Sequence, residues 1–130
     1  MNNKILYALV ALCLGGCATY GPTWSEISGN RYDKTILDRA PALIANVDGT
    51  SYTRTTRYPI KVDPGPHDIL LEGVSTRWAD TPLQKMSITL EPCRRYYLNA
   101  QFENRINASW TPVVDYVEPI AGCPAPGRAG

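Results

Sequence analysis

The sequence predicts an all-β domain, a small β-sandwich of about six to seven strands that follows an N-terminal leader. Three observations support this prediction. Short segments alternate between apolar and polar residues, with the period of two that a half-buried strand requires. Turn signals rich in Gly, Pro and Asp recur at a spacing of roughly ten residues. Helical periodicity is scarce: residues 35–39 are the one helical candidate, and Pro41 stops it.

The predicted strands share a short apolar face and a turn signal at one end. They cover residues 42–48, 57–62, 67–73, 86–90, 94–103 and 110–117. The dipeptide Asp48-Gly49 is a strong turn signal after the first strand. Two prolines in the turn 63–66 leave no route to a helix, so we expect the strands on either side of it to pair as a hairpin.

The clearest strand covers residues 94–103, where apolar and polar side chains alternate strictly. The apolar face takes Tyr96, Leu98, Ala100 and Phe102, and the other face takes Arg95, Tyr97, Asn99, Gln101 and Glu103. This alternation indicates a sheet that is buried on one side and wet on the other. In the last strand we expect Val113, Val114 and Val117 to point inward.

The N-terminal residues read as a secretory signal. Lys4 precedes an apolar run over residues 5–14, and small residues then abut a cysteine in the order Leu14-Gly15-Gly16-Cys17. This segment resembles the lipobox of bacterial lipoproteins. The resemblance implies a signal peptide over residues 1–16 and a diacylglycerol, with acyl chains such as palmitate, on the Cys17 thiol. A spanning helix is disfavoured because ten apolar residues reach about 15 Å, half of the hydrocarbon core. An ordinary signal peptide is disfavoured because it would end in an Ala-x-Ala-like site.

The same resemblance implies a destination. Ala18 follows the cysteine, where lipoproteins of the inner membrane usually carry an aspartate, so we expect the outer membrane and a domain that faces the periplasm. Residues 17–34 are rich in Gly, Ser, Thr and Asn, which predicts a lipid anchor and a flexible tether before the domain at 35–130. Within the tether, Trp24 either packs on the domain or sits at the lipid interface, and the sequence leaves both open.

The charge balance excludes several classes of partner. Removing residues 1–16 leaves 114 of the 130 residues, and the loss of Lys4 leaves 12 basic residues against 12 acidic ones. A nucleic-acid partner needs a basic stripe, and no block of like charge occurs. We therefore expect no nucleic-acid binding and no electrostatic steering towards anionic headgroups.

The cysteines separate by position. Cys13 leaves with the signal peptide and Cys17 takes the lipid, so Cys93 and Cys123 remain for an oxidising compartment. We expect one disulfide between them. A redox pair usually has Cys-x-x-Cys spacing and a zinc site needs four ligands, and neither condition is met.

Two segments carry a second resemblance. Residues 62–71 read VDPGPHDILL and residues 88–98 read ITLEPCRRYYL. Their order of strand, Pro-Gly turn, strand, loop, alternating strand, turn and Tyr-Tyr strand resembles PEGA-like and related transthyretin-like domains. In that family the last turn usually ends in glycine, whereas Cys93 stands here. The resemblance implies a β-sandwich of about seven strands, and a binding or scaffolding role in the envelope without catalysis or cofactor.

The residues offer little for catalysis. His67 is the only histidine, and it lies beside a turn flanked by Asp63 and Asp68 that more often serve as turn caps than as an acid–base pair. We expect no catalytic residue, no metal site and no cofactor.

Aromatic and polar residues predict a binding surface instead. We expect Trp78, Arg95, Tyr97, Asn99 and Trp110 to form it. Core packing explains the tryptophans equally well. The leading hypothesis is a non-enzymatic outer-membrane lipoprotein that binds or scaffolds within the envelope. The alternatives are a peptidoglycan-binding module and a periplasmic hydrolase.

Overall fold

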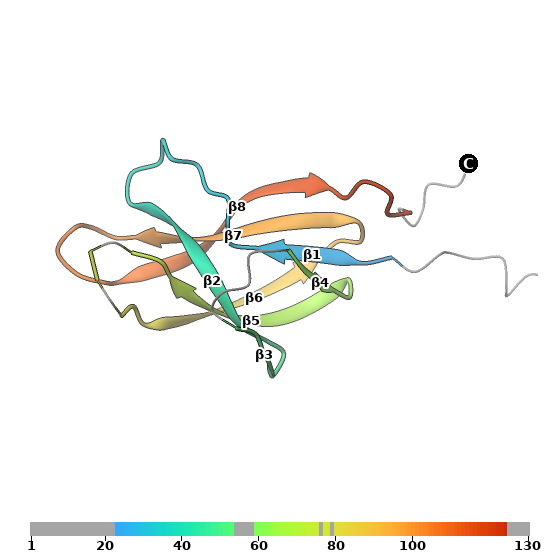
Figure 1. The fold of residues 1–130 in the computed structure, drawn as a ribbon, viewed down its shortest axis with the longest axis horizontal. Coiled ribbons are helices and arrows are strands. Elements are labelled where there is room, and N and C mark those ends of the chain that lie inside the picture. Colours follow the sequence, from blue (N-terminus) through green and yellow to red (C-terminus); the bar gives the residue numbers. More distant parts are fainter. Residues whose placement is uncertain (1–22, 54–58, 76, 79, 125–130) are drawn as a thin grey trace, which may run out of the picture.

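A computed structural model describes residues 23–53, 59–75, 77–78 and 80–124. Over these residues the chain is all-β, as the sequence predicts, with eight strands and no helix (Figure 1). The strands are β1 (Ser25–Ser28), β2 (Arg39–Val47), β3 (Thr50–Ser51), β4 (Ile60–Val62), β5 (Gly65–Gly73), β6 (Leu83–Leu90), β7 (Arg94–Phe102) and β8 (Trp110–Pro119). The six predicted segments do not include the short strands β1 and β3.

One continuous mixed sheet folds into the two layers of a small β-sandwich (Figure 1). The β7 layer joins β4, β1, β7 and β8, with β1 parallel to β7 and the other pairs antiparallel. The β5 layer joins β3, β2, β5 and β6, all antiparallel. β2 belongs to both layers, because Arg39–Pro41 pair with β7 and Ala42–Val47 pair with β5.

The core lies between the layers and is formed by the apolar faces that alternation predicts. Met86 and Ile88 of β6 are half-buried against it. Its buried members are Ile27, Ala42, Ile44, Val47, Ile60, Ile69, Leu71, Leu90, Tyr96, Leu98, Ala100, Phe102 and Trp110. Every described strand except β3 contributes at least one residue buried by more than nine-tenths, and in β6 that residue is Leu90 at the end of the strand.

Strand β1 corrects the expected tether. Residues 25–28 lie inside the segment 17–34, yet they form a strand between β4 and β7. Ile27 is fully buried opposite Ile60 on one side and Tyr96 on the other. The expectation of a flexible tether is therefore wrong for residues 25–28, because that short segment places an isoleucine in the core. Residues 17–22 lie outside the described residues.

The pairing of β4 corrects the expected hairpin. β4 pairs with β1 in the β7 layer, whereas β5 pairs with β2 and β6 in the other layer. The turn after β4 therefore carries the chain from one layer to the other. Residues 35–39 also depart from the helical candidate, since they form turns before β2 starts at Arg39. The predicted strand segment 57–58 lies outside the described residues.

Strand β8 corrects the inward assignment of one of its valines. Val113 pairs with Asn99 on the outer face of β7, whereas Val114 and Val117 pair with Leu98 and Tyr96 of the core face and are 40% and 38% exposed. A β-bulge shifts the register between the pairs Tyr97–Tyr116 and Leu98–Val114, so Asp115 is an extra residue on β8. Among the described strands β8 pairs only with β7, so it lies at the edge of its layer, where Val114 and Val117 are more exposed than their partners Leu98 and Tyr96.

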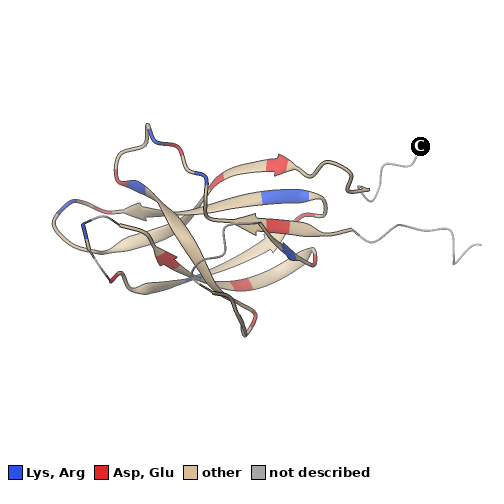
Figure 2. Cartoon of the chain, in the orientation of Figure 1, with Lys and Arg blue, Asp and Glu red and all other residues tan. Residues whose placement is uncertain are grey.

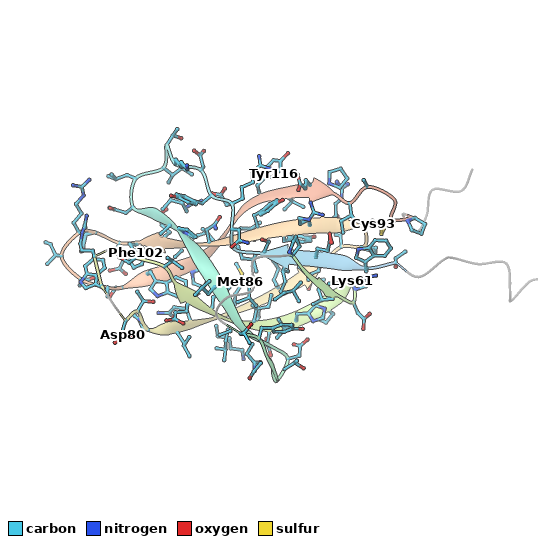
Figure 3. All side chains as sticks on the ribbon, viewed as in Figure 1. Lys61, Asp80, Met86, Cys93, Phe102 and Tyr116 are labelled. Carbon is cyan, nitrogen blue, oxygen red and sulfur yellow. A yellow bond between two sulfur atoms is a disulfide. The ribbon has the colours of Figure 1, made fainter. Side chains whose placement is uncertain are left out.

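The two ends of the sandwich differ. We call one the disulfide end, where β1 begins, the β6–β7 turn lies and Cys93 pairs with Cys123. We call the other the loop end, formed by loops 74–82 and 103–109. Figure 3 labels Cys93 and Lys61 towards the first end and Phe102 and Asp80 towards the second.

Candidate functional site

The predicted binding surface does not form one patch. Arg95 and Tyr97 lie half-buried on the outer face of β7. Asn99 belongs to the same face but is fully buried, so its expected exposure is wrong. Trp110 is only 3% exposed and Trp78 is half-buried, and both lie at the loop end. The structure therefore divides the five residues between a face and an end of the sandwich.

Asn99 is buried because the connection between β1 and β2 runs alongside β7. Its Nδ2 donates to the carbonyl oxygen of Gly29 at 3.0 Å. The next outward residue, Gln101, donates to the carbonyl of Leu37 at 2.9 Å. Alternation along β7 identifies which face these residues share, but only the path of residues 29–38 decides that this part of the face is covered.

The outer face of β7 and β8 carries a compact polar network. Arg95 donates to Glu26 at 2.9 Å and to Glu118 at 2.8 Å, and Tyr97 donates to Glu118 at 2.5 Å. Hydrogen bonding with Tyr97, then with Glu118 and Glu26, raises the pKa of Arg95 although burial opposes the shift. The hydrogen bonds from Tyr97 and Arg95 lower the pKa of Glu118. The charges on this face largely neutralise one another.

Two further residues extend this network to the surface. The Arg31 guanidinium lies 4.3 Å from the Tyr116 ring centroid and 5.4 Å from that of Tyr97. The two tyrosine rings stack at 6.2 Å. The Arg31 side chain is 55% exposed and Tyr116 is 44% exposed. We call Arg31, Arg95, Tyr97, Tyr116 and Glu118 the tyrosine face. Arg31 was missed in the sequence because it lies in the expected tether.

The tryptophans at the loop end pack rather than project. The indole Nε1 of Trp110 donates to the carbonyl of Pro82 at 2.8 Å, which joins β8 to the 74–82 loop. Phe102 lies between the two tryptophans, with ring centroids 6.4 Å from Trp110 and 5.7 Å from Trp78. For Trp110, core packing is therefore a better explanation than ligand binding. Trp78 also lines a groove.

A groove of about 330 Å³ opens beside Trp78. Its lining mixes aromatic rings with hydrogen-bonding side chains and includes Tyr32, Asp38, Arg77, Trp78, Phe102 and Asn104. We call it the Trp78 groove. Arg39 also lines it, but this side chain forms a buried ion pair with Asp115. Arg77 is exposed and donates to the carbonyl of Arg105 at 3.4 Å. Figure 2 shows basic and acidic residues interspersed along the chain near this end and elsewhere.

His67 forms a separate cluster near the β2–β3 turn. Its Nδ1 lies 2.5 Å from a carboxylate oxygen of Asp48, and its Nε2 lies 2.5 Å from the carbonyl oxygen of Asp63. Both partners are acceptors, so the ring satisfies both contacts only when both nitrogens are protonated. Burial lowers the pKa of His67, but the hydrogen bonds to Asp48 and Asp63 and their charges raise it above the ordinary value.

The carboxylates around His67 serve as structural acceptors. Asp48 accepts the Asp68 backbone N–H at 2.7 Å, and Asp68 accepts the Ser87 hydroxyl at 2.6 Å. The hydrogen bonds from the Asp68 backbone and from His67 lower the pKa of Asp48. Among the described residues no group of three or more His, Cys, Asp or Glu side chains is arranged to hold a metal ion. In the same residues no helix is long and apolar enough to cross a membrane.

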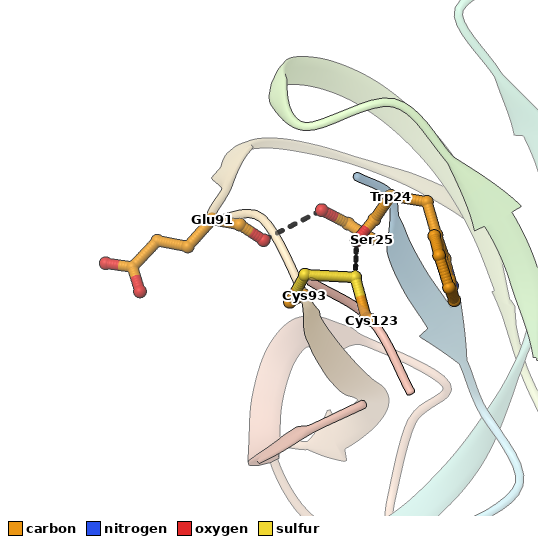
Figure 4. The surroundings of a disulfide bond; sticks show 5 residues. All are labelled: Trp24, Ser25, Glu91, Cys93 and Cys123. Atoms are coloured by element: carbon orange, nitrogen blue, oxygen red, sulfur yellow. Dashed lines mark hydrogen bonds between the residues drawn. A yellow bond between two sulfur atoms is a disulfide. The ribbon is translucent and has the colours of Figure 1, made fainter. Parts of the chain in front are cut away.

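The disulfide joins Cys93 and Cys123, whose Cα atoms are 5.5 Å apart (Figure 4). The Trp24 carbonyl accepts the Cys93 N–H at 2.8 Å and lies 3.7 Å from the Cys123 sulfur. Ser25 adds a hydrogen bond from its hydroxyl to the Glu91 carbonyl at 2.8 Å. The disulfide thus fastens the C-terminal segment to the β6–β7 turn at the place where β1 begins.

Cys93 has a backbone φ of 60°, in the left-handed region that favours glycine. No protein family, no curated protein and no solved structure matches this chain. Cys17, the expected lipid-bearing residue, lies outside the described residues.

Proposed function

We propose that this chain is a non-enzymatic lipoprotein of the bacterial outer membrane that binds or scaffolds a partner within the periplasm. The order Leu14-Gly15-Gly16-Cys17 after a basic and an apolar region supports the lipid anchor. The observation that carries the binding role is the Trp78 groove, where aromatic rings and hydrogen-bonding side chains converge on one cavity.

The surroundings of His67 favour binding over catalysis. A general base needs a ring nitrogen with a free lone pair, and both nitrogens of His67 face acceptors instead. The Ser87 hydroxyl, which lines the same pocket as His67, donates to Asp68 rather than to the histidine. We therefore assign His67 to the folding of this region and assign no residue to catalysis.

We also infer a relationship to PEGA-like domains from the two segments that resemble them. The left-handed backbone at Cys93 supports this inference, because the family's usual glycine at that position tolerates the same conformation. A cysteine there replaces conformational freedom with a covalent link to Cys123. The relationship concerns the fold and carries no activity.

The binding role is tested by cross-linking tagged full-length protein in its own membrane and recovering the partner. We expect wild type to recover one consistent envelope partner, and Trp78→Ala and Arg77→Glu to lose it. Arg77 is exposed, so Arg77→Glu changes the groove without opening the core. The matched control is Tyr116→Ala on the tyrosine face, which we expect to retain the partner. Retention by both groove variants would contradict the assignment of the groove.

Peptidoglycan is the second candidate ligand. An aromatic ring beside side chains that form hydrogen bonds is a common arrangement for a sugar, and Trp78, Asp38 and Asn104 provide it in one groove. In this case wild-type protein sediments with purified sacculi and Trp78→Ala remains in the supernatant. Release of soluble fragments from those sacculi would instead favour a hydrolase and contradict the non-enzymatic proposal.

A further inference from the structure

The point where the described chain begins limits how the domain sits on a membrane. Thr23 is the first described residue, and five residues, 18–22, lie between it and Cys17. Whatever conformation they adopt, the six Cα-to-Cα steps from Cys17 to Thr23 span at most about 22 Å. An acyl chain on Cys17 therefore holds Thr23 within that distance of the bilayer surface. This step rests on the lipid anchor proposed above.

Thr23 is at the disulfide end of the sandwich. Trp24 contacts Cys93 and Cys123 through its carbonyl oxygen, and its ring lies 4.2 Å from the Lys61 ammonium group. Because β1 runs parallel to β7, Glu26 pairs with Arg95 near the start of that strand. Figure 1 shows the described chain starting at the same end as its last described residues.

The loop end is too far from Thr23 to lie at the membrane in place of the disulfide end. From Arg94 to Phe102 the nine residues of β7 rise by about 27 Å. Loop 103–109 continues beyond Phe102. If the loop end rested on the bilayer, Thr23 would stand farther from it than the segment from Cys17 to Thr23 can reach.

The side chains of the disulfide end suit a headgroup layer. Trp24 is half-buried with a lysine over its ring, and both residue types are common at the boundary between lipid and water. Exposed Lys61 and Arg94 are balanced by exposed Asp63 and Glu91. Charge therefore gives this end no preference for anionic lipid, and the acyl chains supply the attachment.

We propose that the disulfide end lies against the lipid headgroups and that the loop end, with the Trp78 groove, points away from the membrane. The partner of the groove is then a component that stands off from the lipid surface. Trp24, which packs on the domain beneath Lys61, would then also face the lipid interface.

The test uses acylated full-length protein in phosphatidylcholine vesicles that contain a nitroxide-labelled lipid. A fluorescent label is placed on Asp63→Cys at the disulfide end or on Ile106→Cys, which is 88% exposed at the loop end. Vesicles without nitroxide are the control. We expect quenching at position 63 to exceed quenching at position 106 several-fold, with no change when anionic lipid is added.

The outcomes separate the orientation from the anchor. Protein that carries the acyl mass and floats with vesicles, but shows equal quenching at both positions or more at 106, refutes the orientation alone. Protein that lacks the acyl mass and does not float refutes the anchor, and the orientation with it.

Discussion

At the scale of single residues, His67 has an unusual environment for the only histidine of the chain. Asp48 and the Asp63 carbonyl hold its two nitrogens, so the folded state favours the charged ring. The contacts join the β2–β3 turn to the segment that passes between the two layers. The protonation of one side chain is thereby coupled to the packing of two connections.

This coupling predicts a pH dependence of stability. The pKa of His67 is raised in the folded state, so its contribution is complete below the unfolded value of about 6.5 and is lost as pH rises through the folded value. We expect the free energy of unfolding to fall across that window, and His67→Gln to remove the dependence. Urea unfolding at several pH values measures it, and an NMR titration of the single imidazole locates the folded pKa. A pKa below 6.5 would contradict the geometry.

A second prediction concerns Cys93, which combines a disulfide with a left-handed backbone. The disulfide closes a loop with a sequence separation of 30 residues, so Cys93→Ser should lower the free energy of unfolding by about 3.5 kcal/mol. Cys93→Gly loses the same bond but relieves the backbone, so its loss should be about 1 kcal/mol smaller. Chemical denaturation of the two variants measures the difference. Equal losses would show that the left-handed conformation has no cost there.

The individual residues of the predicted binding surface were the hardest to place from the sequence. Alternation puts Asn99 on the polar face of β7. The residues next to it in the sequence do not predict that the Gly29 carbonyl and its neighbours cover it. Trp110 is the first residue of β8 and is buried, and its indole N–H donates to the Pro82 carbonyl, 28 residues away in the chain. Such contacts between distant segments leave no periodic signal in the sequence.

At the scale of the elements, β1 is the feature on which the β7 layer depends. The chain leaves β1 at Gly29 so closely that an added Cβ would lie 1.6 Å from the Ala42 carbonyl oxygen. That oxygen belongs to the backbone and cannot rotate away. Glycine is therefore required at this position by close approach rather than by its φ angle.

Gly29→Ala should consequently cost more than about 3 kcal/mol or prevent folding. The matched control is Gly49→Ala in the β2–β3 turn. That residue has a φ of 92° and nothing within 4 Å of its added Cβ, so we expect a cost of about 1 kcal/mol. Thermal unfolding of the two variants makes the comparison. A smaller loss at Gly29 than at Gly49 would contradict the close approach of Gly29 to the backbone of Ala42 in β2.

Most strands could be predicted because their residues alternate over five or more positions. The segments 67–73, 86–90 and 94–103 match β5, β6 and β7 closely. β1 was missed because four residues, Ser-Glu-Ile-Ser, contain one apolar side chain and no visible period. The β4–β5 hairpin was wrong because a proline-rich turn stops a helix but does not say whether the next strand stays in the same layer.

At the scale of the whole molecule, the sandwich has one end where covalent and hydrogen bonds gather and one end built from loops. The disulfide, the Trp24 carbonyl and the Ser25 hydroxyl brace the start of β1, which is the part of the domain nearest to Cys17 in the chain. The groove and the long connections lie at the opposite end. The proposed anchor and the proposed binding site therefore occupy separate ends.

The anchor is the claim on which the proposed location, orientation and role all depend. Its most direct test is the intact mass of the protein extracted from membranes, for wild type and for Cys17→Ser. We expect wild type to begin at residue 17 with the added mass of a diacylglycerol, and the variant to keep residues 1–16 without lipid. A wild-type protein that retains residues 1–16, or that begins at another residue without lipid, would contradict the account.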